Sequence, residues 1–121
     1  MENTLNEFGE VLISEIRDKT LMNFEKIITG VLKGETNQTL YKQISVMSLA
    51  DQETLKRIVY RMVDLTIHNT LFLFEESEDN WVISNPILGI ENLSELSDGL
   101  SGELYGGNGW IAKYSDFSKE L

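Results

Sequence analysis

The side chains best suited to chemistry lie in the middle of the chain, on a stretch with helical periodicity. Five of them share one narrow helical stripe, since they follow one another at steps of 4, 3, 4 and 7: Arg57, Arg61, Asp64, His68 and Glu75. His68 is the only histidine, and an acid one turn before it can orient the imidazole for acid–base work or hold it charged near neutral pH. The same spacing also fits a solvated ridge of weak ion pairs. The sequence leaves both interpretations open.

A glycine-rich stretch, Ser97–Trp110 (SDGLSGELYGGNGW), is the most distinctive part of the sequence and contains five of the nine glycines. Its pattern differs from a Walker motif, because Trp110 and Ile111 stand where that motif needs lysine and serine or threonine. A dinucleotide fingerprint would lack its third glycine, and Asp98 and Glu103 would repel phosphate. The stretch predicts a tight path that shows Asp98 and Glu103 outward and brings four residues onto the helices: Leu100, Leu104, Tyr105 and Trp110. It serves either as a packing loop or as a binding surface.

The composition predicts no metal site, no cofactor and no catalytic residue. There is no cysteine and a single histidine, so a metal would need oxygen ligands almost throughout. The run EESEDN alternates such oxygens, but no glycine or closing glutamate follows at EF-hand spacing. The absence of cysteine also suits a reducing compartment.

Charge is distributed unevenly along the chain. The net charge is −10, and residues 62–112 contain nine acids and neither lysine nor arginine. Such a surface repels phosphate backbones, which argues against direct nucleic-acid binding. It attracts a basic protein and accelerates the encounter with it. A purely solubilising acidic surface is the alternative explanation.

We expect a cytoplasmic protein without a membrane segment. The first ten residues, MENTLNEFGE, carry acids where a secretion signal needs bases and an apolar core. The longest uncharged runs, Leu65–Phe74 and Asn80–Ile90, have about half the length of a bilayer span. The apolar share of 41% and the charged share of 25% are ordinary for a globular protein. A length of 121 residues fits one domain, 1–121.

Hydrophobic periodicity predicts three main helices. The first covers about residues 3–32 and has a kink near Thr20. Its inward residues are Leu5, Phe8, Leu12, Ile16, Phe24, Ile27 and Val31. A short second helix lies near residues 40–47, and the third begins at a capping box formed by Ser48 and Asp51 and runs to about Glu75. The inward residues of the third helix are Leu55, Ile58, Val59, Met62, Thr66, Leu73 and Phe74.

After the third helix the periodicity changes. Residues 80–90, around the only proline, Pro86, predict a short irregular or β segment. The apolar residues after Asn108 fit either a short helix or a strand over residues 108–117. The expected fold class is mainly α: a single small domain of three main helices plus a short C-terminal helix. Its core should contain Leu12, Ile16, Phe24, Ile58, Met62 and Phe74.

Two motifs carry a resemblance to known proteins. The segments DLTIHNTLFLFEE and LSELSDGLSGELYGGNGWIAKYS resemble a group of small bacterial proteins that share a His-Asn-Thr helix and an SDGL-x-GELY…GW ending. The resemblance covers about residues 64–115 and leaves the N-terminal helix unmatched. It implies a bacterial source, and it brings no established activity and no catalytic residues.

The favoured function is that of a non-enzymatic, acidic interaction protein of the bacterial cytosol, which contacts a basic protein partner through residues 75–110. Its sharpest version is immunity- or antitoxin-like, by analogy with acidic inhibitors of basic nuclease toxins. The residues expected at the binding site are Arg61, Asp64, His68, Glu75, Glu76, Asp98, Glu103 and Trp110.

The rival function is a small-molecule-binding protein or minor enzyme with a site around Asp64 and His68, covered by the glycine-rich loop 97–110. Convergence of Asp64, His68, Asp98 and Glu103 on one concave pocket would favour this rival. Acids spread over a convex face would favour the protein partner. The sequence leaves the oligomeric state open.

Overall fold

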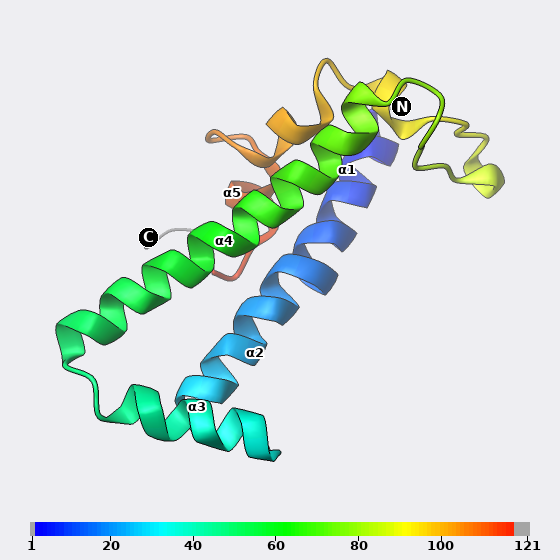
Figure 1. The fold of residues 1–121 in the computed structure, drawn as a ribbon. Helices are drawn as coiled ribbons and strands as arrows, with labels where there is room; N and C mark the ends of the chain where they lie inside the picture. The colour runs from blue at the N-terminus through cyan, green and yellow to red at the C-terminus, as the bar shows by residue number, and fades with distance from the viewer. Residues whose placement is uncertain (1, 118–121) are drawn as a thin grey trace.

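The computed structural model describes residues 2–117 and is mainly helical, as predicted. The first rod is continuous: α1 (Glu2–Leu12) passes through a π-helical turn, η1 (Ile13–Asp18), into α2 (Lys19–Ile28). The short α3 (Glu35–Ser45) leads to the long α4 (Leu49–Glu76). The two rods lie close together where α1 meets the end of α4 and diverge toward α3, which closes a triangle (Figure 1).

The beginning of α4 follows the predicted capping signal. The Ser48 hydroxyl oxygen accepts a hydrogen bond from the Asp51 backbone N–H at 3.1 Å. This bond satisfies one of the N–H groups that the first turn of a helix leaves without a partner. The helix ends at Glu76, one residue beyond the predicted end.

After α4 the chain forms short turns rather than long helices or strands. Three 3₁₀ turns, η2 (Pro86–Leu88), η3 (Leu93–Leu96) and η4 (Leu100–Leu104), precede the last helix, α5 (Trp110–Tyr114). The helical alternative for residues 108–117 is therefore confirmed as far as Tyr114. Of the two alternatives for residues 80–90, the irregular one is right, because the described chain has only an isolated antiparallel bridge there, Asn85 with Ile90.

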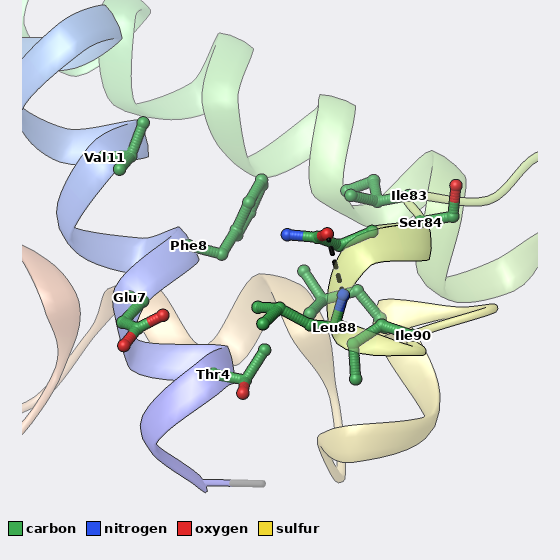
Figure 2. A pocket seen from close by; sticks show the side chains of 10 residues that line it. Thr4, Glu7, Phe8, Val11, Ile83, Ser84, Leu88 and Ile90 are labelled. Carbon is green, nitrogen blue, oxygen red and sulfur yellow. Dashed lines mark hydrogen bonds between the residues drawn. The ribbon is translucent and has the colours of Figure 1, made fainter.

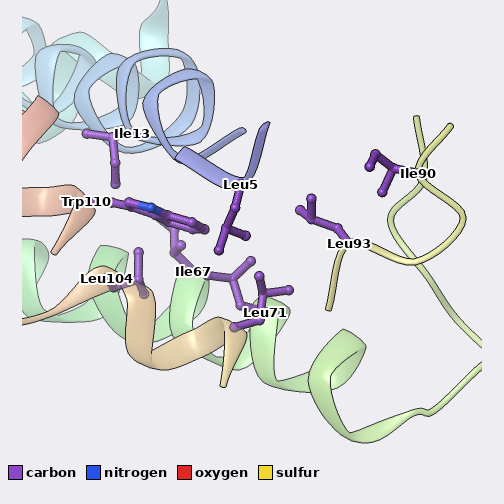
Figure 3. Packing of buried hydrophobic residues seen from close by; sticks show 9 residues of the cluster. Leu5, Ile13, Ile67, Leu71, Ile90, Leu93, Leu104 and Trp110 are labelled. Atoms are coloured by element: carbon purple, nitrogen blue, oxygen red, sulfur yellow. The ribbon is translucent and has the colours of Figure 1, made fainter. Parts of the chain in front are cut away.

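The core lies between the α1 end of the first rod, the second half of α4 and the turns that follow it (Figure 3). Its buried members are Leu5, Ile13, Ile67, Leu71, Ile90, Leu93, Leu100, Leu104 and Trp110. Of the residues predicted for the core, Leu12 and Phe74 pack against this cluster. The prediction was wrong for Ile16, Ile58 and Met62, which are exposed.

The error has a physical reason on each rod. α4 is apolar on two sides, and η4 covers the side with Ile67 and Leu71 rather than the side with Ile58 and Met62. On the first rod the buried positions follow at steps of four: Leu5, Gly9, Ile13, Arg17 and Leu21. In a regular α-helix each such step overshoots a full turn by about 40°. In the π-turn each backbone hydrogen bond spans one residue more than in an α-helix. This extra residue rotates the line of buried positions back toward the core and leaves the Ile16 side chain exposed.

The triangle formed by α2, α3 and the first half of α4 has little core. No residue from 22 to 59 is fully buried, and α3 contains no buried residue at all. Half-buried side chains such as Phe24, Tyr41 and Leu55 line it instead. None of the helices in residues 2–117 is both long enough and apolar enough to cross a bilayer.

Candidate functional site

His68 meets the glycine-rich loop on the outer side of α4. Its Nδ1 atom lies 3.2 Å from the Tyr105 hydroxyl oxygen, within hydrogen-bond distance. The imidazole also stacks parallel to the Phe72 ring, with 6.1 Å between the ring centroids. The loop therefore does reach the predicted histidine, and it does so through Tyr105, one of the residues expected to pack on the helices.

The surroundings of Tyr105 keep its phenol protonated. Burial raises the pKa of Tyr105 above its ordinary value of 10.0, and the Asp64 carboxylate raises it further, while Arg61 acts in the opposite direction. The phenol is thus a neutral hydrogen-bond group beside His68 at physiological pH. Arg61 itself is exposed on α4.

Asp64 is engaged elsewhere, so the predicted Asp64–His68 pair is replaced by two other contacts. The Asp64 carboxylate accepts hydrogen bonds from Nε of Arg17 at 2.6 Å and from Nη2 at 3.4 Å. The Arg17 side chain is almost completely buried, at 3% exposure. A carboxylate that helps to neutralise a buried guanidinium is a structural group, because removing it would leave that charge with the Asp18 carboxylate alone, 3.5 Å from Nη1.

The same arginine ties the C-terminal segment to the first rod. Nη1 of Arg17 donates to the Ser115 hydroxyl oxygen at 2.7 Å and to the Phe117 carbonyl at 3.1 Å. The neighbouring Asp18 accepts from the Ser115 hydroxyl at 2.6 Å and from the Asp116 backbone N–H at 2.8 Å. The π-turn allows both charged side chains to point inward, since it widens the helix at this point.

Two of the acids predicted for the binding site hold the glycine-rich loop in place. The Glu75 carboxylate accepts from the backbone N–H of Ser101 at 2.9 Å and from its hydroxyl at 2.8 Å. Glu103 accepts from the Ser97 hydroxyl at 2.6 Å. Both acids are half-buried. The donors to these two carboxylates belong to the protein itself, so the two acids have a structural role.

Trp110 is a core residue, which confirms the packing-loop alternative and corrects its assignment to the binding site. Its side chain is 1% exposed, and the indole N–H donates to the Asn6 side-chain carbonyl at 3.1 Å. The ring also meets Phe8 edge-on, with 5.9 Å between centroids. A ligand could reach this indole only by unfolding the C-terminal segment.

The remaining acids form an exposed charged surface, which we call the acidic pole. It comprises residues 76–98, a segment without lysine or arginine. All six of its acids are exposed: Glu76, Glu78, Asp79, Glu91, Glu95 and Asp98. The pole lies at the end of α4 and in the turns that follow, at the opposite end of the molecule from α3 (Figure 1). Two predicted site residues, Glu76 and Asp98, belong to it.

A loop at residues 77–92 projects from the acidic pole and carries four exposed apolar side chains: Trp81, Val82, Ile87 and Leu88. Trp81 is 67% exposed and Ile87 is 95% exposed. The loop backbone is nevertheless well fixed: the Ser77 hydroxyl donates to the Trp81 carbonyl at 2.6 Å, and the Asn92 amide donates to the Glu78 carbonyl at 3.2 Å. Large apolar side chains held out into solvent are typical of a contact surface.

A pocket of about 260 Å³ lies between this loop and α1 (Figure 2). Its lining is mostly apolar, with Phe8 and Val11 on one side and Leu88 and Ile90 on the other. The Asn85 side-chain oxygen accepts from the Leu88 backbone N–H at 3.2 Å and fixes the wall that faces α1. Glu7 stands on the α1 side and adds a negative charge. The pocket suits an apolar side chain, or a long basic one with an apolar stem.

The four residues that decide between the two predicted functions do not converge. Asp64 and Glu103 are bonded to different partners, Asp98 is exposed on the pole, and none of them lines the pocket of Figure 2. Within residues 2–117, no group of three or more histidine, aspartate or glutamate side chains is placed to share a metal ion.

Sequence reasoning missed Trp81, Ile87 and the pocket. A signal for Trp81 was present, because a tryptophan directly after the polar run ESEDN has no partner on the loop itself. Ile87, next to Pro86, resembles the apolar residues of a short strand, so its sequence context gave no reason to expect exposure. The pocket joins α1 to a segment eighty residues away, and such a contact leaves no local pattern.

No protein-family model matches the chain, and neither a curated protein nor a solved structure is similar enough to count as a match. The resemblance of residues 64–115 to bacterial proteins therefore stays a prediction.

Proposed function

We propose that this protein is a non-enzymatic interaction protein that binds a basic protein partner through its acidic pole. The single observation that carries this proposal is the projecting loop, where Trp81 and Ile87 stand exposed within an acidic pole of six acids without any lysine or arginine. An exposed surface that combines apolar anchors with one sign of charge fits a protein partner better than a small molecule.

The two features of the loop would contribute to different steps of binding. The acids attract a basic surface over a distance and raise the association rate, an effect that salt screens. The apolar side chains then bury area against the partner, at about 25 cal/mol for each Å² removed from water. Because the backbone of the loop is already fixed by Ser77 and Asn92, little conformational entropy is lost on binding.

The most specific form of the proposal is an immunity- or antitoxin-like role in a bacterial cytosol. Nuclease toxins are commonly basic, and an acidic inhibitor can imitate the charge of their substrate. This step is an analogy, and its support here is the density of exposed acids on residues 76–98. The pocket beside the loop would receive one side chain of the partner.

The rival function, a small-molecule site at His68 under the glycine-rich loop, has one observation in its favour. Tyr105 of that loop contacts His68. However, the acid that the site needs, Asp64, neutralises Arg17, and Trp110 is buried in the core. The contact accounts for how the loop is fastened to α4, and it leaves no acid–base pair at the histidine.

Affinity capture from the source cell tests the proposal. The bait is the full chain, compared with Trp81→Ala/Ile87→Ser and with a matched control, Val46→Ser, which changes an exposed apolar residue far from the pole. We expect wild type and control to capture the same basic protein, and the loop variant to lose it. With that protein purified, the variant Glu76→Gln/Glu78→Gln/Glu91→Gln/Glu95→Gln should associate more slowly and with a weaker salt dependence. Capture that is unaffected by either set of changes would exclude the acidic pole.

A further inference from the structure

The chain exposes more surface than a compact monomer of its size. Its accessible surface is 8066 Å², whereas a folded monomer of 13.8 kDa exposes about 6600 Å². The excess of roughly 1400 Å² exceeds the ~800 Å² that each partner contributes to a standard protein interface. Some of this surface is therefore suited to being covered in solution.

A weakly buried region of the fold contributes to this excess of accessible surface. The triangle of α2, α3 and the first half of α4 contains no fully buried residue from 22 to 59. An apolar groove of about 300 Å³ lies between the two rods. Its lining residues belong only to η1, α2 and α4. Three apolar residues of the groove stay half in solvent: Ile16 at 51%, Ile58 at 52% and Met62 at 50%.

These exposed positions are the ones that the periodicity of the sequence marks as inward. Ile16, Ile58 and Met62 fit the apolar stripes of their helices, and the C-terminal segment covers the other side of α4 instead. Neither η3, η4 nor α5 contributes to the groove. A helix with two apolar sides, one of them uncovered, has a second packing surface.

The distribution of charge along the chain indicates which molecule covers the groove. The arm formed by residues 19–61 contains seven bases and four acids, while the acidic pole, residues 76–98, contains six acids and no base. The arm and the pole lie at opposite ends of the molecule (Figure 1). The lining of the groove lies partly within the arm and continues along α4 as far as Ile67. Two copies placed side by side in parallel would repel each other, whereas an antiparallel pair sets each basic arm opposite the other acidic pole.

We infer that a second copy of this chain docks on the groove, antiparallel to the first, and forms a two-fold symmetric dimer. The two-fold axis passes between Ile58 and Met62, so that Ile58 of each copy meets Met62 of the other, as an isologous interface requires. The acidic poles remain at the outer ends. The groove contains no residue of the projecting loop, so the dimer does not depend on the proposed partner, although the acidic pole that faces the basic arm is also part of the proposed partner surface.

Sedimentation velocity or light scattering on the full chain, at tens of micromolar, measures the mass. We expect twice 13.8 kDa for the wild type and a monomer for Ile58→Asp/Met62→Asp. Because both side chains are half in solvent, that variant should keep the helical circular dichroism of the wild type. The matched control Leu49→Asp lies on the same helix, is 83% exposed and does not line the groove, and it should remain a dimer.

A charge exchange tests the antiparallel arrangement. Lys33→Glu/Lys42→Glu reverses two charges of the basic arm, and Glu76→Lys/Glu78→Lys reverses two charges of the pole. At low ionic strength each variant alone should dimerise more weakly than the wild type, and an equimolar mixture should form the heterodimer in preference. A wild-type monomer overturns the dimer and assigns the groove to another partner; a mixture without preference for the heterodimer overturns the antiparallel arrangement.

Discussion

The indole ring of Trp110 occupies the space that a side chain at residue 9 would need. Gly9 is buried on the first rod, and a Cβ built there overlaps the six- and five-membered rings of the tryptophan. The absence of a side chain at residue 9 therefore allows the C-terminal segment to lie against α1, where the Trp110 N–H also finds Asn6. A glycine in the middle of a helix is otherwise unfavourable.

Gly9→Ala should destabilise the protein although it improves helix propensity. The substitution gains about 1 kcal/mol of intrinsic propensity, but overpacking a rigid ring costs about 1–3 kcal/mol or more. We expect a net loss, measured by urea unfolding. Gly102→Ala is the control, since a Cβ at residue 102 meets no atom within 4 Å. A Gly9→Ala chain more stable than wild type would contradict the packing of Trp110.

The buried pair of Arg17 and Asp64 gives a second prediction. Asp64→Ala leaves the buried Arg17 guanidinium with only the Asp18 carboxylate, at 3.5 Å, which should lower the free energy of unfolding, by less than the ~3–5 kcal/mol of a fully unpaired buried charge. Arg17→Met/Asp64→Ala should lose less than the sum of the two single changes, because each single change already breaks the hydrogen-bonded pair that the double change removes. Strictly additive losses in this double-mutant cycle would show that the two side chains act independently.

The sequence predicted the helices better than their packing. Ser48 and Asp51 are neighbours in the chain, so the beginning of α4 could be inferred from local chemistry. The periodicity of α4, in contrast, fits two apolar sides equally well, and only the later segment around Leu100 and Leu104 decides which side is covered. That choice depends on the tertiary fold and has no signature within the helix.

The candidate site failed for a related reason. His68 and Asp64 are one turn apart, and the prediction joined them because spacing is all that a single helix offers. Each side chain has a partner distant in sequence instead: Tyr105 for His68 and Arg17 for Asp64. The π-turn that points Arg17 inward is also invisible in the composition of the rod. The charge of the acidic pole could be predicted, because it depends on composition alone.

Alkaline pH should destabilise the protein partly through Tyr105. Its pKa is raised in the folded state, first by burial and then by Asp64, so the unfolded chain loses this proton first as the pH rises past 10.0. The stability that the neutral phenol contributes is complete below that pH and is lost as the pH rises through the folded pKa. Burial raises the pKa of Tyr60 as well, so the two effects add.

Tyr105→Phe separates these contributions. The variant should lose less stability than the wild type between neutral pH and values above 10.0, the ordinary tyrosine pKa, and the raised pKa of Tyr60 contributes to the loss that remains. Unfolding free energies across that range, with tyrosinate absorption followed in parallel, measure the difference. Identical pH curves for the variant and the wild type would mean that the Tyr105 phenol is solvated like that of a free tyrosine.

Adjacent acids at the end of α4 should respond in opposite ways to the same substitution. Glu75 accepts two hydrogen bonds from Ser101, and Glu75→Gln should lower the free energy of unfolding by about 1–3 kcal/mol, because hydrogen bonds to a charged acceptor are the stronger kind. Glu76 is exposed at a helix C-terminus, where negative charge is unfavourable. Glu76→Gln should therefore leave stability unchanged or raise it by about 0.3–1 kcal/mol.

The substitutions Glu75→Gln and Glu76→Gln also distinguish an effect on folding stability from an effect on partner binding. Once a basic partner is purified, Glu76→Gln should slow its association, since this acid belongs to the acidic pole, while Glu75→Gln should change stability and leave the association rate alone. Neutralising the pole as a block must for this reason leave Glu75 intact; otherwise a loosened glycine-rich loop would be mistaken for a lost contact. If Glu75→Gln proved harmless to stability and slowed association, the Ser101 hydrogen bonds would be incidental, and the contact surface would extend from the projecting loop onto η4.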